Sequence, residues 1–234
     1  MTFNFPKNIV NSLLSVLFPP LCAVCGETLN EKEEYFCLSC FRKLPYTSYA
    51  KIADNEAFIR FMGKIPIEKA SSFLFYNKGG IGQKIVGEIK YHGNIRLGKY
   101  FGAFMAEKML STGFFEHIDC LVPVPLHRSK QKKRGFNQAE VIASGISAAT
   151  GIPVISDNVV RKKATSTQTR KGIFERWLNT KEIFEVKNPE IFDNKQVMII
   201  DDVLTTGSTL EAVAACILQK AKGVKIHILT LAIA

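Results

Sequence analysis

The segment Val197–Leu210 constrains this chain most, because it joins an apolar strand to two acids and a small, hydroxyl-rich turn. Four apolar residues lead directly into Asp201 and Asp202. At the carboxyl end of a buried parallel strand, free backbone N–H groups meet the positive end of the following helix. A glycine there lets the backbone approach a ligand, and hydroxyls add donors without bulk. We therefore predict a phosphate monoester site on Thr205, Thr206, Gly207, Ser208 and Thr209.

The acid pair before this turn needs a different role, because two carboxylates facing a bound dianion would repel it. They become useful when they hold sugar hydroxyls or a metal ion. A ribose 5-phosphate with its phosphate on the turn places its 2′- and 3′-hydroxyls near Asp201 and Asp202. The alternative is a solvated acid pair before an ordinary helix cap. The run of apolar strand, acid pair and Thr-Thr-Gly-Ser-Thr argues against that alternative.

The rest of the chain alternates between strand and helix patterns. Apolar strands are predicted at 72–76, 120–124, 197–200 and 224–233, and helical stripes at 81–89, 97–105, 137–146 and 210–217. Unbroken apolar strands that alternate with helices indicate a parallel sheet covered on both faces. The sequence therefore predicts an α/β fold over residues 51–234, preceded by a small module over residues 1–50.

The charge of the chain favours an anionic partner. Its formal net charge is +10, which suits either a polyphosphate or a nucleic acid. Residues 125–138 hold five Lys or Arg and no acid, and residues 161–181 hold seven against one Glu. Such runs are often solvated surface, but both lie beside predicted strand ends, on the edge where α/β sheets place ligands.

Four cysteines form two Cys-x₂-Cys pairs separated by eleven residues. Two short knuckles can place four thiolates around one zinc ion, which leaves no open position for catalysis. The sequence therefore predicts a structural zinc site, and a pair of disulfides or a site without metal are the alternatives. The ligands are Cys22, Cys25, Cys37 and Cys40. The preceding stripe from Ile9 to Leu17 predicts an amphipathic helix, too short and polar for a membrane span, so we expect a cytoplasmic protein.

The segment 197–210 closely resembles the motif by which type I phosphoribosyltransferases bind phosphoribosyl pyrophosphate (PRPP). That resemblance implies that Asp201 and Asp202 are the catalytic acids, which contact the ribose hydroxyls directly or through Mg²⁺. It implies that Thr205–Thr209 hold the 5′-phosphate. The family reaction displaces pyrophosphate from C1 of the ribose, and the acids favour the positive charge that grows on the sugar.

Further motifs narrow the resemblance to the ComF family, the competence-associated proteins similar to phosphoribosyltransferases. They are Val-Pro-Val-Pro-Leu-His at 122–127, Lys-Lys-Arg-Gly-Phe-Asn-Gln-Ala at 132–139, Thr-Ser-Thr-Gln at 165–168 and Ile-Lys-Tyr-His-Gly at 89–93. The resemblance implies a type I phosphoribosyltransferase fold behind a zinc-ribbon-like module. It places Lys90, Arg134, Asn137 and Gln138 around pyrophosphate and Mg²⁺, and Thr167, Gln168 and Arg176 on a mobile flap. Here Arg176 is followed by Trp177, where the family pattern has a second basic residue.

Two functions follow from this resemblance. The first is an enzyme that transfers phosphoribose from PRPP to an acceptor that the sequence does not identify. The second is a non-catalytic protein that senses PRPP, or binds single-stranded DNA and the competence machinery during natural transformation. The basic loops serve either function, so both hypotheses remain open at this point.

Overall fold

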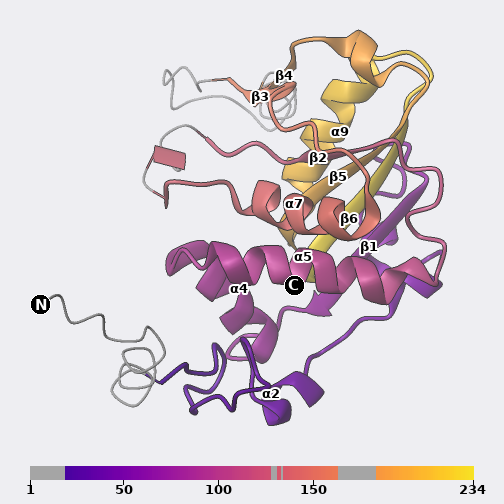
Figure 1. Cartoon of the computed structure of the whole chain (residues 1–234). Coiled ribbons are helices and arrows are strands. Elements are labelled where there is room, and N and C mark those ends of the chain that lie inside the picture. The colour runs from indigo at the N-terminus through magenta and orange to yellow at the C-terminus, as the bar shows by residue number, and fades with distance from the viewer. Residues whose placement is uncertain (1–18, 128–130, 133, 163–182) are drawn as a thin grey trace, which may run out of the picture.

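A computed structural model describes residues 19–127, 131–132, 134–162 and 183–234 of the 234-residue chain. Its central feature is a four-stranded parallel sheet in the order β1-β6-β5-β2 (Figure 1). The register aligns Ile200 with Leu229 on one side and with Pro123 on the other. The strands are β1 (Lys69–Phe75), β2 (Cys120–Pro123), β5 (Gln196–Leu204) and β6 (Lys225–Ile233).

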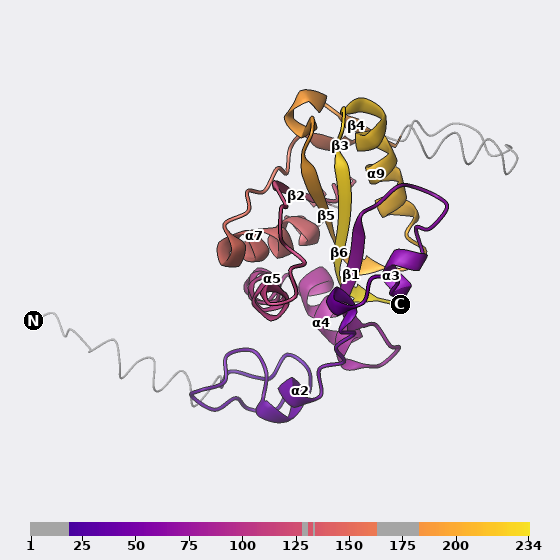
Figure 2. The same ribbon diagram turned by 90° about the vertical axis from the view of Figure 1, so that its right-hand side faces the viewer.

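Helices cover both faces of this sheet, which Figure 2 shows nearly edge-on. One face packs against α4 (Ile81–Tyr91), α5 (Ile95–Leu110) and α7 (Gln138–Thr150). The other packs against α3 (Glu56–Ile59) and α9 (Ser208–Lys220). The predicted parallel sheet between two helical layers is confirmed.

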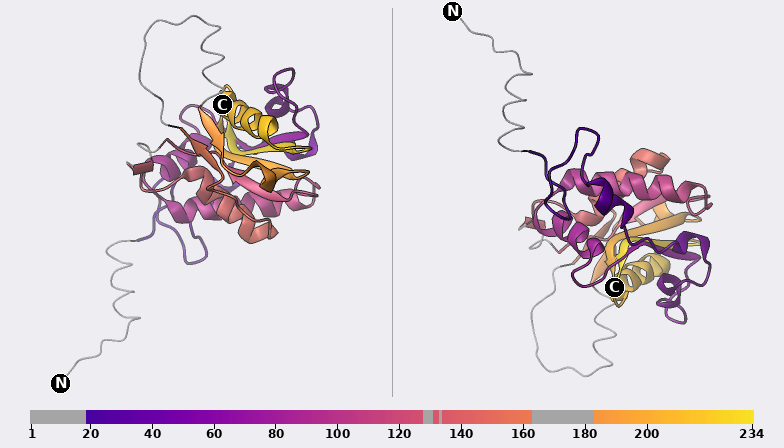
Figure 3. Two further views of the ribbon diagram at one scale, coloured as in Figure 1. Left: turned by 90° about the horizontal axis from the view of Figure 1, so that it is seen from above. Right: turned by 90° about the horizontal axis from the view of Figure 1, so that it is seen from below.

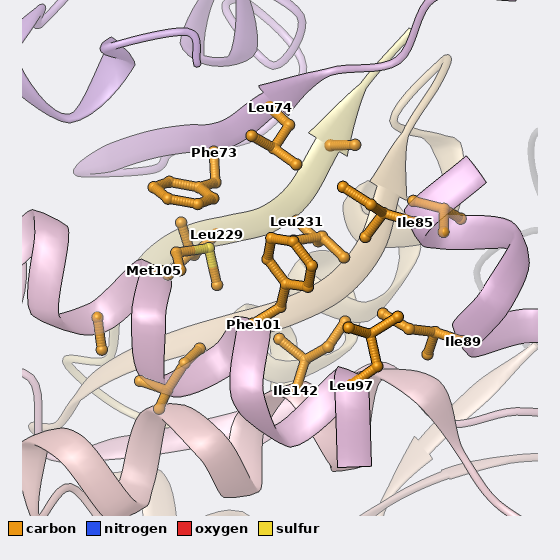
Figure 4. Packing of buried hydrophobic residues seen from close by; sticks show 14 of the residues in the cluster. Phe73, Leu74, Ile85, Ile89, Leu97, Phe101, Met105, Ile142, Leu229 and Leu231 are labelled. Atoms are coloured by element: carbon orange, nitrogen blue, oxygen red, sulfur yellow. The ribbon is translucent and has the colours of Figure 1, made fainter. Parts of the chain in front are cut away.

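Two glycines allow α5 and α7 to pack with their backbones almost in contact. A Cβ atom added to Gly102 would lie 2.1 Å from the carbonyl oxygen of Ile142, and one added to Gly145 would lie 2.1 Å from that of Lys99. Phe101 of α5 then lies between Ile142 of α7 and Leu229 and Leu231 of β6 (Figure 4). This contact fixes the layer of α4, α5 and α7 onto the sheet.

Several short elements were not predicted from the sequence. The antiparallel pair β3 (Val159–Arg161) and β4 (Phe184–Val186) flanks the second basic segment. Strands of three residues carry too little periodicity for detection. The others are α2 (Leu38–Arg42), α3 and the 3₁₀ helices η1 (Tyr49–Lys51) and η2 (Pro189–Phe192).

The cysteine module packs directly on the helical layer, below α4 and α5 in Figure 1 and beside them in Figure 3. Phe36 meets Phe101 edge-on with ring centroids 5.4 Å apart, and Phe41 lies 5.4 Å from Phe104. The ammonium of Lys84 in α4 donates to the carbonyl of Val24 at 2.9 Å. Buried module residues therefore belong to the same hydrophobic cluster as the sheet and α5. The helix predicted from Ile9 to Leu17 lies outside the described residues.

The polar connector after the module is a packed structure around one buried amide. Asn55 accepts from the N–H of Phe58, and its side-chain N–H₂ donates to the carbonyls of Tyr49, Ile52 and Ala70. A buried polar side chain is retained only when such partners satisfy it.

No helix in the described parts of the chain combines the length and apolarity that crossing a bilayer requires.

His227 gives the fold a pH dependence at the edge opposite the phosphate turn. Burial, and then the charges of Lys69 and Lys225, lowers its pKa to about 4. The unfolded chain, with an ordinary pKa near 6.5, binds the proton first as pH falls. Stability from this residue is therefore complete above about pH 6.5 and lost towards pH 4, by up to about 3 kcal/mol.

We expect His227→Asn to remove that pH-dependent component of stability. The measurement is the urea unfolding free energy of both proteins at pH 7 and at pH 4.5. Parallel curves for both proteins would contradict the assignment.

Candidate functional site

The predicted phosphate turn lies where β5 ends and α9 begins. Gly207 caps α9 with φ of +81°, a left-handed conformation that favours glycine, and a Cβ there would lie 3.0 Å from the ring of Phe61. The hydroxyls of Thr206 and Ser208 lie 3.0 Å apart. Within the described part of the chain, the N–H groups of Thr206 and Gly207 have no acceptor. Free donors beside a helix N-terminus are the arrangement that an anion site requires.

The acid pair lies near the carboxyl end of β5, just after Ile200, the last residue of β5 that pairs with β2. Asp202 forms an ion pair with Lys90 from the end of α4, with Nζ 2.8 Å from Oδ1. Asp201 accepts from the Asp202 N–H at 2.9 Å. Burial, and next the charge of Asp202, raises the pKa of Asp201 well above its usual range. The two neighbouring carboxylates repel each other, and a divalent ion or donor hydroxyls would relieve this repulsion.

Residues 134–138 approach the same edge of the sheet from α7. Asn137 caps α7, and its side-chain amide donates to the carbonyl of Val124, the residue after β2, at 3.0 Å. The guanidinium of Arg134 lies 5.6 Å from the ring of Tyr91, the neighbour of Lys90. Gln138 differs from its neighbours because it is only 1% exposed, and its Nε2 has no partner among the described residues. The fold thus brings Lys90, Arg134 and Asn137 to one edge.

A cavity of about 510 Å³ lies beside Asn137, between the end of β2, the start of α7 and the β3–β4 pair. Its lining is mostly polar, with Arg161, Lys162 and Lys187 as the cations and Glu140 and Glu185 as the acids. Lys162 and Glu185 pair at 3.7 Å across it. The cavity therefore offers a polar space next to the end of β2.

The predicted flap residues Thr167, Gln168 and Arg176 lie outside the described residues, as does Trp177. The basic loop is described at Gln131, Lys132 and Arg134 but not at 128–130 or 133. His92, next to the site, forms an ion pair with Glu88 at 2.7 Å on an exposed helix end. Cys120 and Cys216 are buried in the core, in agreement with the apolar segments that surround them in the sequence.

Sequence reasoning missed Arg60, which contacts the phosphate turn from α3. Its guanidinium donates to the carbonyl of Thr205, and to that of Ala234 at 2.6 Å. It also pairs with Glu56 at 2.6 Å. These contacts span 145 and 174 positions, and the surrounding sequence carries no motif. Only the tertiary structure could reveal them.

The four module cysteines converge as the spacing predicted. Their sulfur atoms all lie within 4.8 Å of one another, and those of Cys25 and Cys37 are 3.7 Å apart. A tetrahedral ion with zinc–sulfur bonds of about 2.3 Å separates its ligands by about 3.8 Å, so these residues fit zinc. Backbone N–H groups of Cys25, Cys37 and Val24 outweigh burial and lower the pKa of Cys22 to about 6, which favours the thiolate.

Comparisons with known proteins agree with both parts of the molecule. The phosphoribosyl transferase domain model matches residues 102–233, and the double zinc ribbon domain model matches residues 13–50. Competence protein ComFC of Bacillus subtilis is 26% identical over 97% of this chain and 90% of its own length.

Two further relatives match a shorter part. Competence protein F of Haemophilus influenzae is 35% identical over 41% of this chain and 42% of its own. The DNA utilization protein YhgH of Escherichia coli is 34% identical over 43% and 44%. The phosphoribosyl transferase domain match covers more than half of the chain, and the match to ComFC covers nearly all of it. The chain therefore belongs to the ComFC/competence protein F family, with a phosphoribosyltransferase domain and an N-terminal double zinc ribbon.

Proposed function

We propose that this protein binds PRPP with Mg²⁺ and transfers its phosphoribose to an acceptor still to be identified. In this proposal residues 1–50 form the zinc module and residues 51–234 the phosphoribosyltransferase-like domain. The observation that carries the proposal is that turn amides without an acceptor among the described residues lie at the same strand end as the acid pair and Lys90. The phosphate needs the turn amides, and the ribose needs the acid pair. The acid pair and the turn follow one another along the chain, as the ribose and the phosphate do in ribose 5-phosphate.

The residues have complementary tasks. Thr205–Thr209 bind the 5′-phosphate, and Asp201 and Asp202 accept from the ribose hydroxyls and favour the cationic character that develops at C1. Lys90 holds Asp202 in place while Arg134 adds positive charge towards the pyrophosphate. Bound Mg²⁺ neutralises charge on the departing pyrophosphate. Burial, and then the charge of Asp202, raises the pKa of Asp201, and a divalent cation bound beside the pair would favour the ionised carboxylate again.

Loss of the leaving group is the test of transfer. Pyrophosphate release from PRPP should be measured with Mg²⁺ against nucleobases, small amines and single-stranded DNA, one acceptor at a time. Acceptor-dependent release supports the enzyme. If PRPP binds but no acceptor causes pyrophosphate to be released from it, transfer is rejected and the protein is a PRPP sensor.

A second candidate function is binding of single-stranded DNA in the context of competence. The net charge of +10 and the basic segment next to the site favour it. The names of the relatives, which refer to competence and to DNA utilization, support the same context. This candidate is compatible with PRPP binding, because Arg134 is the one residue that the two proposals share.

If the basic loop contacts DNA phosphates, the affinity for single-stranded DNA falls steeply with salt. Neutralising Lys132, Lys133 and Arg134 together to glutamine should flatten the plot of log affinity against log salt by about 2 units, since each phosphate contact contributes about 0.7. Fluorescence anisotropy with labelled oligonucleotides measures this slope. Lys220, Lys222 and Lys225 neutralised to glutamine provide a charge-matched control remote from the loop. Equal slopes for the wild type and the loop variant would reject the contact.

A further inference from the structure

We infer that Arg60 is a positioning residue that presets the phosphate turn for its ligand. This inference rests on the proposed function for its ligand, but its structural basis is independent of turnover. Arg60 is the residue after α3, and its side chain is 24% exposed. Its guanidinium donates to the backbone carbonyl of Thr205, at the start of the turn, and not to the turn's N–H groups or hydroxyls.

Because the peptide bond is planar, a hydrogen bond to the Thr205 carbonyl also orients the N–H of Thr206. In a trans peptide the carbonyl of one residue and the N–H of the next point in opposite directions. The guanidinium of Arg60 holds the Thr205 carbonyl, so the N–H of Thr206 is directed to the other side. That N–H is among the turn amides without an acceptor in the described part of the chain. Arg60 therefore aims a free donor without contacting the ligand.

Three chain segments meet at this guanidinium, which is why it can hold the turn in one place. Besides Thr205 it binds the Ala234 carbonyl at 2.6 Å, and the Ala234 N–H donates to the Leu204 carbonyl at 2.9 Å. Figure 2 shows α3 beside the C-terminal end of β6. A guanidinium holds five donors in a rigid planar fork, whereas an ammonium is a compact charge on a flexible stem.

Neighbouring residues fix Arg60 in turn. Glu56 pairs with it at 2.6 Å and accepts from the Tyr49 hydroxyl at 3.0 Å. The next residue, Phe61, is fully buried, and its ring limits Gly207 to a glycine. The carboxylate neutralises Arg60, so the arginine acts on the turn through geometry more than through charge. The connector between the zinc module and the sheet thus supports the phosphate turn from behind.

The experiment compares Arg60→Ala and Arg60→Lys with the wild type and with Arg42→Ala, an exposed arginine of the zinc module. Backbone ¹⁵N relaxation of the ligand-free proteins gives order parameters for Thr206 and Gly207. We expect these to fall from about 0.85 towards 0.6 in both Arg60 variants, while values in β5 and in the later turns of α9 are retained. Lysine preserves charge but not the fork, so it should not restore the turn.

Calorimetric titrations supply a second readout. Ribose 5-phosphate and PRPP, which carry the 5′-phosphate, should bind about tenfold more weakly to both Arg60 variants, the effect of one hydrogen bond to a charged group. Inorganic pyrophosphate, which does not need the turn, should bind with unchanged affinity. A general loss of structure would weaken all three ligands equally and overturn the inference, as would unchanged order parameters at Thr206 and Gly207.

The two proposals fail in different ways. If wild-type protein binds neither ribose 5-phosphate nor PRPP, the proposed function is rejected, and relaxation alone decides the role of Arg60. If the wild type binds both ligands and the Arg60 variants bind them equally well, the proposed function stands and the positioning role is rejected. Arg60→Lys keeps the test valid should Arg60→Ala fail to fold.

Discussion

Replacing Asp201 by asparagine is expected to weaken Mg²⁺-dependent PRPP binding about 100-fold, or about 2.7 kcal/mol. The substitution preserves shape and keeps an oxygen that can accept from the Asp202 N–H. It removes the charge that a metal ion or ribose hydroxyls require. Because burial already disfavours the ionised carboxylate, the folded protein should lose no stability. Calorimetry with PRPP and Mg²⁺ measures the affinity, and denaturant unfolding measures the stability.

Asp119→Asn is the matched control for this experiment. Asp119 lies at the opposite end of the sheet, where it accepts from the Gln196 N–H at 2.7 Å. Its substitution should leave PRPP affinity unchanged, although it removes the same charge from the same molecule. An Asp201→Asn protein with wild-type affinity would show that the acid pair does not contact the sugar, and the site assignment would be wrong.

Loss of the zinc site is expected to destabilise the whole molecule rather than the module alone. Cys40→Ser removes one of four thiolates, and we expect zinc content to fall from about one per chain and the unfolding free energy to drop by several kcal/mol. The reason is packing: Phe36 and Phe41 contact Phe101 and Phe104 of α5, in one continuous hydrophobic cluster. Metal analysis and urea unfolding followed by circular dichroism provide the measurements.

Cys216→Ser serves as the control, because Cys216 is an equally buried cysteine on α9 outside the cluster of four. It should retain full zinc content, with a loss of stability set only by packing. A Cys40→Ser protein that keeps its zinc would contradict the four-thiolate site. Zinc-free protein with unchanged sheet stability would contradict the energetic link between module and sheet.

The phosphate turn and the acid pair could be predicted because their chemistry is local. Strand, acids, glycine and hydroxyls occur within fourteen consecutive residues, so the chain order alone places them at one strand end. The same holds for Asn137, whose role as a helix cap depends on its nearest neighbours. The four cysteines were equally accessible, since zinc ligation dictates their spacing.

Contacts between distant segments could not be predicted in this way. The pairing of Lys90 with Asp202 depends on how α4 lies across the sheet, and that depends on the strand order β1-β6-β5-β2. The same is true of Asn55, which is buried although its neighbours in the sequence are polar. Its three backbone partners come together only when the connector packs against β1.

By itself the sequence determined the parallel α/β class and the four cysteines that converge, and it predicted the phosphate and ribose site, because each depends on short-range spacing and periodicity. Only the tertiary structure decided which cations serve which acids, that the module shares its core with the sheet, and that Arg60 holds the phosphate turn. Such contacts join residues up to 174 positions apart. Their energies are set by the packing of whole layers, which no local pattern in the chain encodes.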